Sequence, residues 1–296
     1  MAKEIPKTPS SSIKGFTGKK KYIYPDGTVY EGDWVDGKHH GTGKYTGHDG
    51  VSYEGDYVND KKHGKGKFTY SLGIVFEGDW IDNTHAGKGK LTYPNGDVYE
   101  GTISGQQTKH GKGKITFANG DIYEGDFALG ARTGKGTYIW ANGDVYEGDF
   151  TDGKITGKGK FIWADGDVYE GDFVDEKKQG KGKCTFSDGD IYEGDWLNDK
   201  RTGKGKLTYA SGNVYEGDYI NGKQTGKGKM LIAETGVVYE GDFVDGKWHG
   251  KGKMTGPDGG IYEGDFVNDR IQGKGKLTYI DGKVEEGTWK NGKFMG

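Results

Sequence analysis

The sequence predicts an all-β protein: an elongated, single-layer solenoid of stacked antiparallel β-hairpins with a period of 23 residues. Three observations predict this class. A phrase made of an aromatic residue and Glu-Gly-Asp recurs along almost the whole chain, and a second phrase, Gly-Lys-Gly-Lys, follows about half a period later. Turn signals of the Asp-Gly and Asn-Gly type stand between the two phrases. No helical apolar stripe survives between these glycines, so helices are not expected.

The period is read from the first aromatic residue of each Glu-Gly-Asp phrase. Tyr146, Tyr169 and Tyr192 follow one another at intervals of 23 residues, and two other intervals are 24 residues long. Single-residue insertions of this kind are typical of loops. We therefore expect a repeat array over residues 21–296, with about 12 repeats of which the last is truncated, and a disordered tail over residues 1–20.

The composition excludes a thick aliphatic core. Gly contributes 59 residues, and the hydrophobic fraction of 31% already includes 20 Tyr. An aromatic fraction of 13% argues equally against a disordered chain, so the fold must bury rings with little aliphatic volume. One Cys, no leader and no long apolar run predict a soluble, cytoplasmic protein.

Side-chain chemistry selects the register of the hairpins. A three-residue loop at 164–166 sets Phe161 opposite Tyr169 and Gly159 opposite Gly171, which puts every ring and glycine on one face. The other face then carries Lys opposite Glu or Asp, a favourable cross-strand pair. A two-residue loop would mix the two faces. On the ring face, glycines are expected to leave hollows in which aromatic rings lie flat.

Two segments carry a family resemblance. Tyr239 to Lys253 and Leu91 to Val98 resemble the MORN repeat (membrane occupation and recognition nexus), and the resemblance covers about residues 22–296. It implies a single-layer sheet of hairpins with an aromatic groove and no catalytic residues. The sequence is similar to radial-spoke-head-type and other cytoskeletal MORN scaffolds. This similarity implies a cilium, an axoneme or another cytoskeletal assembly as the location.

The function we expect is that of a non-catalytic scaffold that docks a helix or an extended peptide of a protein partner on this aromatic groove. The alternative, that the rings pack only on one another and the array is a spacer, stays open. The residues expected to line the groove are Trp34, Tyr70, Trp80, Trp140, Tyr146, Trp163, Tyr169, Phe173, Trp196 and Tyr209.

A membrane adaptor is the second functional hypothesis. Lysines gathered on one face attract phosphoinositides, but each Lys column is expected beside an acidic column, which weakens this attraction. The lysines of this possible lipid face are Lys65, Lys67, Lys158, Lys160, Lys204 and Lys206.

No cofactor, metal or nucleic-acid site is expected. The charge is nearly balanced, with 42 Lys and Arg against 45 Asp and Glu. Gly148 to Lys154 has the spacing of a phosphate-binding loop, but Ile155 stands where Ser or Thr is required. Histidines of successive repeats should lie about 9.6 Å apart, too far to share a zinc ion. Cys184 is expected to fill space among the rings.

Several copies depart from the pattern. Gly47 and Gly256 replace a ring near each end of the array, and the segment 102–108 loses the usual Asp and aromatic pair, which is either drift or a binding notch. Glu285 replaces the repeated Tyr in a final half-repeat, whose sheet edge is expected to be open, so that homodimerisation through it stays an alternative. Thr8, before a Pro in the tail, is a candidate phosphorylation site.

Overall fold

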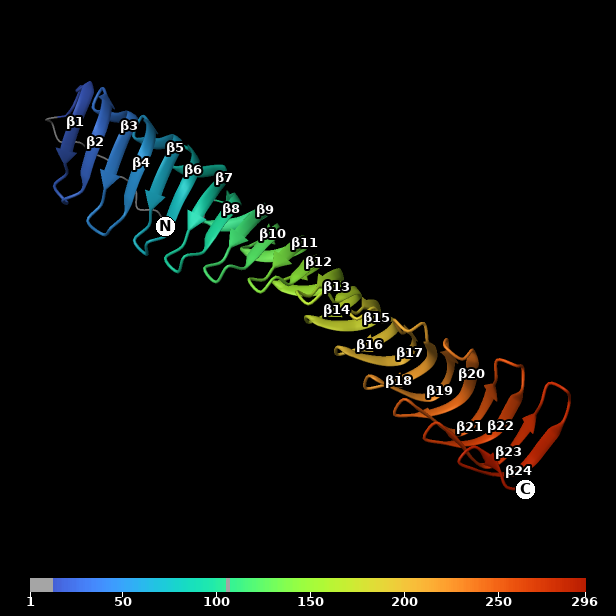
Figure 1. Cartoon of the computed structure of the whole chain (residues 1–296). Coiled ribbons are helices and arrows are strands. Elements are labelled where there is room, and N and C mark those ends of the chain that lie inside the picture. The colour runs from blue at the N-terminus through green and yellow to red at the C-terminus, as the bar shows by residue number, and fades with distance from the viewer. Residues whose placement is uncertain (1–12, 105–106) are drawn as a thin grey trace. The chain divides into compact units, whose positions relative to one another are not determined.

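The computed structural model describes residues 13–104 and 107–296, and its regular elements there are all β-strands (Figure 1). Within these residues no helix is long and apolar enough to cross a membrane. The strands are β1 Gly18–Ile23, β2 Val29–Val35, β3 Lys38–Thr46, β4 Ser52–Val58, β5 Lys61–Thr69, β6 Val75–Ile81, β7 Thr84–Thr92, β8 Val98–Ser104, β9 Thr108–Thr116, β10 Ile122–Ala128, β11 Ala131–Ile139, β12 Val145–Thr151, β13 Lys154–Ile162, β14 Val168–Val174, β15 Lys177–Thr185, β16 Ile191–Leu197, β17 Lys200–Thr208, β18 Val214–Ile220, β19 Lys223–Ile232, β20 Val237–Val244, β21 Lys247–Thr255, β22 Ile261–Val267, β23 Arg270–Thr278, β24 Val284–Lys290 and β25 Lys293–Phe294.

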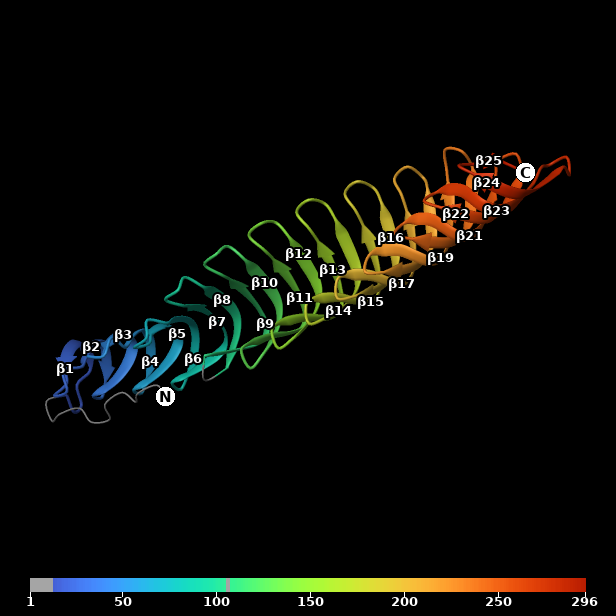
Figure 2. The same cartoon turned by 90° about the horizontal axis from the view of Figure 1, so that it is seen from below.

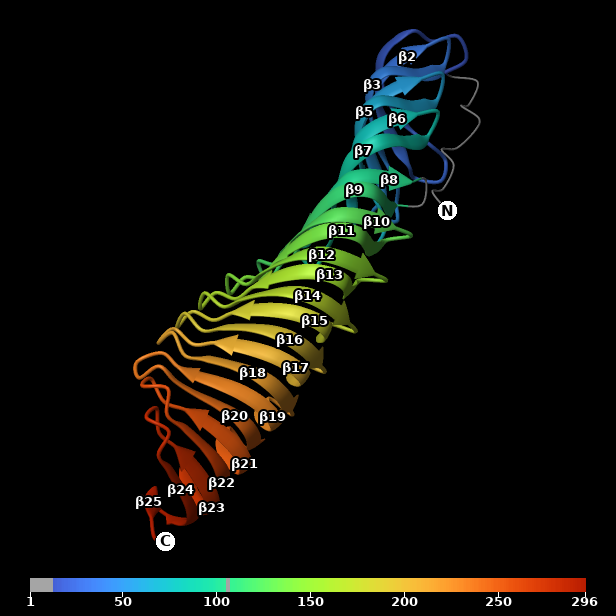
Figure 3. The same ribbon diagram turned by 90° about the vertical axis from the view of Figure 1, so that its right-hand side faces the viewer.

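The chain divides into two compact units. The first comprises Met1–Gly143 and Phe150–Gly153, and the second comprises Asp144–Asp149 and Lys154–Gly296. In each unit, strands that follow one another in the sequence pair antiparallel and form a single layer (Figures 1 and 3). The strands curve instead of lying flat, as the second unit shows well in Figure 2. The prediction of an all-β, single-layer solenoid of antiparallel hairpins is confirmed.

The predicted register is confirmed at the hairpin of β13 and β14. Phe161 lies opposite Tyr169 and Gly159 opposite Gly171. The amide of Trp163 donates to the carbonyl of Asp167 at 2.9 Å and closes the three-residue loop, in which Gly166 has a positive φ of 100°. Gly is favoured at such a position because a side chain would be strained there.

A second type of hairpin joins each Glu-Gly-Asp strand to the next strand, as in β14 and β15. Its two-residue turn, Asp175 and Glu176, has positive φ at both positions, as in a type I′ turn. We call this turn, with the residues that flank it, the tip of the repeat, and the three-residue loop of the other hairpin type the loop end. This two-residue turn was not among the features predicted from the sequence.

A β-bulge bends the strand that follows each tip. In β17 the bulge lies between two pairs of opposed residues, Gly205 with Gly194 and Thr202 with Asp195. The two residues of β17 between these pairs have no partner in β16. Gly203, in the bulge, has a φ of 53°. The amide of Lys204 donates to Oδ2 of Asp195 at 3.0 Å. The Asp of the repeated phrase therefore holds the bulge, and the Gly before Lys-Gly supplies its left-handed residue.

The two ends of the array differ from the predictions. Residues 1–12, Thr8 among them, lie outside the described residues, but Gly18 already pairs with Trp34, so strand structure reaches into the predicted tail. The edge of β24 is not fully open, because the short strand β25 pairs with it. The amide of Met295 also donates to the carbonyl of Thr288 at 2.9 Å.

Candidate functional site

The repeated tyrosines form the core of each unit. Tyr169 is 0% exposed, and its ring lies flat over Gly171 and Gly182, where an added Cβ would clash with it. Its hydroxyl donates to the carbonyl of Asp172 at 3.2 Å. Desolvation is the main cause that raises the pKa of this phenol above its ordinary value. The glycines of both phrases thus serve as packing residues, as the sequence predicted.

Rings from the end of each Glu-Gly-Asp strand complete this core. Phe173 and Trp196 both pack edge-on against Tyr169, with centroid distances of 5.1 and 5.3 Å. Edge-to-face pairs of this kind are worth about 0.5–1.5 kcal/mol beyond the area they bury. Because one pair lies within a repeat and the other joins two repeats, the rings bind neighbouring repeats together.

The expectation that the whole ring face is exposed is wrong for six of the ten predicted groove residues. These six are at most 5% exposed, because the bent tip folds back over them. The other four stand at the loop ends and are half-buried. The buried six are Trp34, Trp80, Tyr146, Tyr169, Phe173 and Trp196, and the half-buried four are Tyr70, Trp140, Trp163 and Tyr209.

The loop end and the tip of a repeat meet over the core ring, as His85 does over Phe76. Tyr70 and His85 form a hydrogen bond of 2.8 Å between the hydroxyl and Nε2, and Gln224 donates to the Tyr209 hydroxyl at 2.9 Å. Each pair joins a loop-end ring to a tip side chain. We call this line of contacts the mouth of the folded sheet. It is the place where the ring face borders solvent.

The tip side chains at the mouth occupy one equivalent position in the repeats, opposite a buried side chain of the preceding strand, which is Ile103 for Lys109 and an aromatic ring for residues such as Lys62. We call this set the tip column. The tip column was not among the predicted site residues, although its members are visible in the sequence as the residue two places before the Gly-Lys-Gly phrase. Its members are His39, Lys62, His85, Lys109 and Arg132 in the first unit and Ile155, Lys178, Arg201, Gln224, Trp248 and Ile271 in the second.

Two members of the tip column are buried titratable groups. His39 is 1% exposed, and desolvation lowers its pKa to about 4. Lys62 is 3% exposed, and desolvation lowers its pKa to about 8. In both cases burial penalises the charged form. His39 is therefore neutral at pH 7, whereas Lys62 still carries most of its charge.

The outer face carries a ladder of ion pairs. Lys65 and Lys67 pair with acidic residues of β6 at 2.7 and 3.2 Å, and Lys158 and Lys160 pair with acidic residues of β14 at 2.9 and 3.2 Å. Lys204 pairs with Asp218 at 2.6 Å. Five of the six lysines of the possible lipid face are thus neutralised locally. Lys206, the sixth, lies opposite Glu216 in the register.

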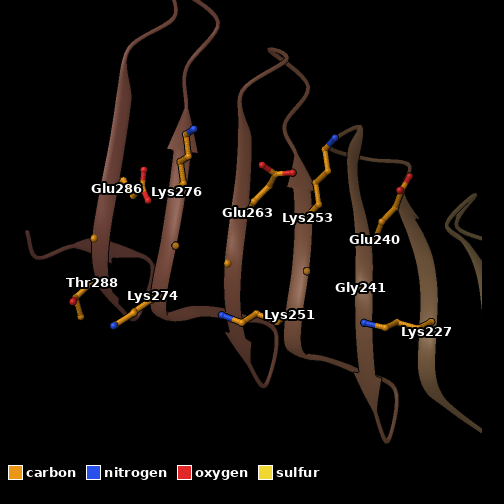
Figure 4. A pocket seen from close by; sticks show the side chains of 14 residues that line it. Lys227, Glu240, Gly241, Lys251, Lys253, Glu263, Lys274, Lys276, Glu286 and Thr288 are labelled. Carbon is orange, nitrogen blue, oxygen red and sulfur yellow. The ribbon is translucent and has the colours of Figure 1, made fainter.

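A trough of about 900 Å³ runs between two rows of charged side chains on this outer face of the second unit (Figure 4). Glycine backbone forms its floor, and Lys and Glu alternate along its upper row. Lys227 and Lys251 of the lower row each pair with an Asp at 2.6 Å. The trough therefore presents charges of both signs.

A family model for the MORN repeat matches this chain in twelve successive segments. They are residues 30–52, 53–71, 76–98, 108–122, 123–145, 146–168, 169–191, 192–214, 215–233, 239–261, 262–284 and 286–296. The chain belongs to the MORN repeat family.

Comparison of the MORN array with other proteins adds little beyond this family. No curated protein sequence matches it. The SAS-4 TCP domain of Drosophila melanogaster, solved with a proline-rich motif, is 18% identical; the match covers 52% of this chain and 84% of that one, with a TM-score of 0.34. The TCP10 domain of Danio rerio CPAP, solved with a STIL peptide, is 14% identical over 92% of this chain and all of that one, with a TM-score of 0.24. The virginiamycin B lyase of Staphylococcus aureus is 12% identical, with coverage of 95% and 97% and a TM-score of 0.14.

Within the MORN array, the irregular copies keep the same backbone. Cys184 is 2% exposed and lies opposite Tyr169 and Tyr192, in the row of core rings, and desolvation raises the pKa of its thiol. The amides of Gly47 and Gly256 each donate across the loop at 2.8 Å, to the carbonyls of Val51 and Gly260, as the Trp163 amide does to Asp167. The ring is therefore missing from the mouth at these two repeats while the loop itself is retained.

Proposed function

We propose that this MORN-repeat chain is a non-catalytic scaffold that binds a protein partner along the mouth of the folded sheet. The observation that carries the proposal is the presence of half-buried loop-end rings in each unit, Tyr70 and Trp140 in the first and Trp163 and Tyr209 in the second. Partly exposed aromatic side chains held by a rigid backbone are typical anchors of protein interfaces. The ring two places earlier in the strand supports three of these anchors. The pairs are Phe68 with Tyr70, Tyr138 with Trp140 and Phe161 with Trp163, at centroid distances of 4.5, 4.5 and 4.4 Å.

We further propose that the partner belongs to a ciliary or other cytoskeletal assembly in the cytoplasm. The support is analogy with other MORN scaffolds, and fold analogy alone does not identify a partner. Localisation of the tagged protein by immunofluorescence tests it. A diffuse signal with no enrichment at a cilium or filament would contradict this part of the proposal and leave the scaffold role intact.

Cross-linking mass spectrometry of the full chain in its native cells tests the scaffold role. The wild type should give cross-links from lysines near the mouth to a reproducible partner, and the Trp140→Ala/Trp163→Ala variant should lose them. Lys65→Gln/Lys67→Gln is the matched control, because it changes the outer face and keeps the mouth. Cross-links that persist in the tryptophan variant, with its circular dichroism unchanged, would overturn the proposal.

Phosphoinositide binding through the outer lysines is the weaker alternative, since five of the six lysines already pair with carboxylates. Co-sedimentation with phosphoinositide liposomes at physiological salt separates the two functions. Pelleting that depends on Lys65 and Lys67 would favour the membrane role.

A further inference from the structure

Five cationic members of the tip column lie over aromatic rings. The Lys62 ammonium lies 4.6 Å from the Phe68 ring centroid, and the Lys178 ammonium lies 4.7 Å from that of Trp196. Contacts of this kind stabilise a cation without neutralising it. The five are Lys62, Lys109 and Arg132 in the first unit and Lys178 and Arg201 in the second.

These cations have no ion-pair partner of their own. Within residues 13–104 and 107–296, no carboxylate oxygen lies within 4.0 Å of a charged side-chain nitrogen of any of the five, although the backbone amide of Lys178 donates to Oδ1 of Asp199 at 2.9 Å. The outer lysines, by contrast, mostly have a carboxylate within that distance, as Lys181 has Asp195 at 2.6 Å. The charges of these five side chains are therefore not cancelled by direct ion pairs, whereas those of the outer face mostly are.

Acidic groups near the mouth are already engaged. Asp121 acts on Arg132 from a distance, but it accepts hydrogen bonds from the Tyr138 hydroxyl at 2.7 Å and from the amide of Ala141 at 2.9 Å. Asp97 acts on Lys109 in the same way and accepts from the amide of Ala118. Arg132 donates to the carbonyl of Gly153 and also forms a hydrogen bond with the Tyr138 side chain, which leaves its remaining N–H groups for a ligand.

The distance between neighbouring members of the tip column limits which peptide conformation could bind along it. Neighbouring members are two strands apart, which is about 9.6 Å. A polyproline II helix repeats every three residues, or about 9.3 Å, so every third side chain returns to the same side. An extended β-strand alternates its side chains and cannot present every third residue to one side.

We propose that the mouth binds an acidic peptide segment in the polyproline II conformation, with a carboxylate at every third residue facing the cations of consecutive repeats. Lys109 with Arg132 in the first unit, and Lys178 with Arg201 in the second, each provide two consecutive half-buried contacts. The proposal rests on the protein-binding role above and gives that role a chemical class of partner.

Fluorescence anisotropy with labelled peptides of repeated Glu-Pro-Ser triplets tests the proposal at neutral pH and physiological salt. Two peptides of the same length, with Gln or Lys in place of Glu, serve as probes of charge. The full chain should bind the Glu peptide and show no binding of the other two. The Lys109→Gln/Arg132→Gln variant should lose binding at the first unit and keep it at Lys178 and Arg201 of the second, so that the number of peptides bound per chain falls from two to one.

The matched control is Lys65→Gln/Lys67→Gln, which removes the same charge from the outer face of the same unit and should change the affinity less than twofold. Lys109→Arg/Arg132→Lys keeps both charges and should retain binding. Equal losses of peptide binding in the mouth and outer-face variants would mean that the peptide binds by nonspecific electrostatic attraction, and this would overturn the proposal. So would equal binding of the Glu and Gln peptides, an outcome that leaves the scaffold role standing. Absence of binding by all three peptides also overturns it, while the cross-linking experiment tests the scaffold role separately.

Discussion

The tip column differs between the early and the late repeats although the backbone around it is the same. In the first unit it holds histidines and cations, with Lys62 buried among three rings. In the late repeats of the second unit it holds Gln224, Trp248 and Ile271, and Trp248 stacks on Tyr239 with a centroid distance of 4.5 Å. The position therefore accepts a cation, an imidazole, an amide or an apolar group over an unchanged core. It is where repeats of one fold can acquire different binding chemistry.

The largest expected effect is the loss of stability when a core tyrosine ring is removed. It tests whether these rings stabilise the two units to the same extent. Tyr53→Ala and Tyr239→Ala each remove a ring that is 0% exposed, so each should cost roughly 3–5 kcal/mol of local stability. Hydrogen exchange of the amides in the affected strands measures this loss. The corresponding Phe variants, which lose only the hydroxyl, should cost about 1 kcal/mol. A clearly smaller loss in one unit would show that the cores differ.

Acid should weaken the early repeats more than the late ones. Below pH 6.5 the unfolded chain protonates His39, whereas the folded chain does not until its pKa of about 4, so stability is lost as the pH falls. At about pH 4.5 the loss should be roughly 2 kcal/mol. Hydrogen exchange near Tyr30, compared with exchange near Tyr215, measures the difference.

His39→Gln is the matched control for this acid effect, since Gln224 shows that an amide fits the column and reaches a loop-end hydroxyl. The variant should lose the extra acid sensitivity near Tyr30 and keep that near His85, whose pKa burial also lowers to about 4. Unchanged sensitivity near Tyr30 would assign the effect there to carboxylates instead of His39.

A gain in stability is expected from Lys62→Met, because the substitution removes a buried cation that has no carboxylate partner. The gain at pH 7 should be about 1–2 kcal/mol. The folded pKa of about 8 lies below the ordinary 10.5, so the wild type should become more stable as the pH rises from 8 toward 10. Urea unfolding followed by fluorescence should show this rise in the wild type and no such rise in the variant.

The smallest effect is expected on the outer face. Lys65→Gln and Lys251→Gln each break an exposed ion pair, and each should cost less than about 0.5 kcal/mol in either unit. Thermal unfolding at low and high salt measures it. A loss above about 1 kcal/mol from either substitution would mean that the ladder contributes to the fold as well as to solubility.

The sequence by itself determined the repeat, the strand type and the register. Phe161 opposite Tyr169 follows from local chemistry, because only the three-residue loop keeps rings and lysines on separate faces. The period placed the loops, and the glycines beside Tyr169 indicated that a ring lies flat on the sheet. These features depend on residues that are close in the sequence or on exact repetition, and both can be read from a single sequence.

Only the tertiary structure decided which rings stay accessible. The bulge at Gly203, held by Asp195, bends the tip back over the ring face, and a bend of this kind depends on a hydrogen bond between strands. Together the bulges of the successive repeats bury Trp34 and Tyr169, leave Trp163 half-exposed at the loop end, and bring Lys178 over the rings. Burial is a property of what folds over a residue, and the pattern of one strand does not contain it.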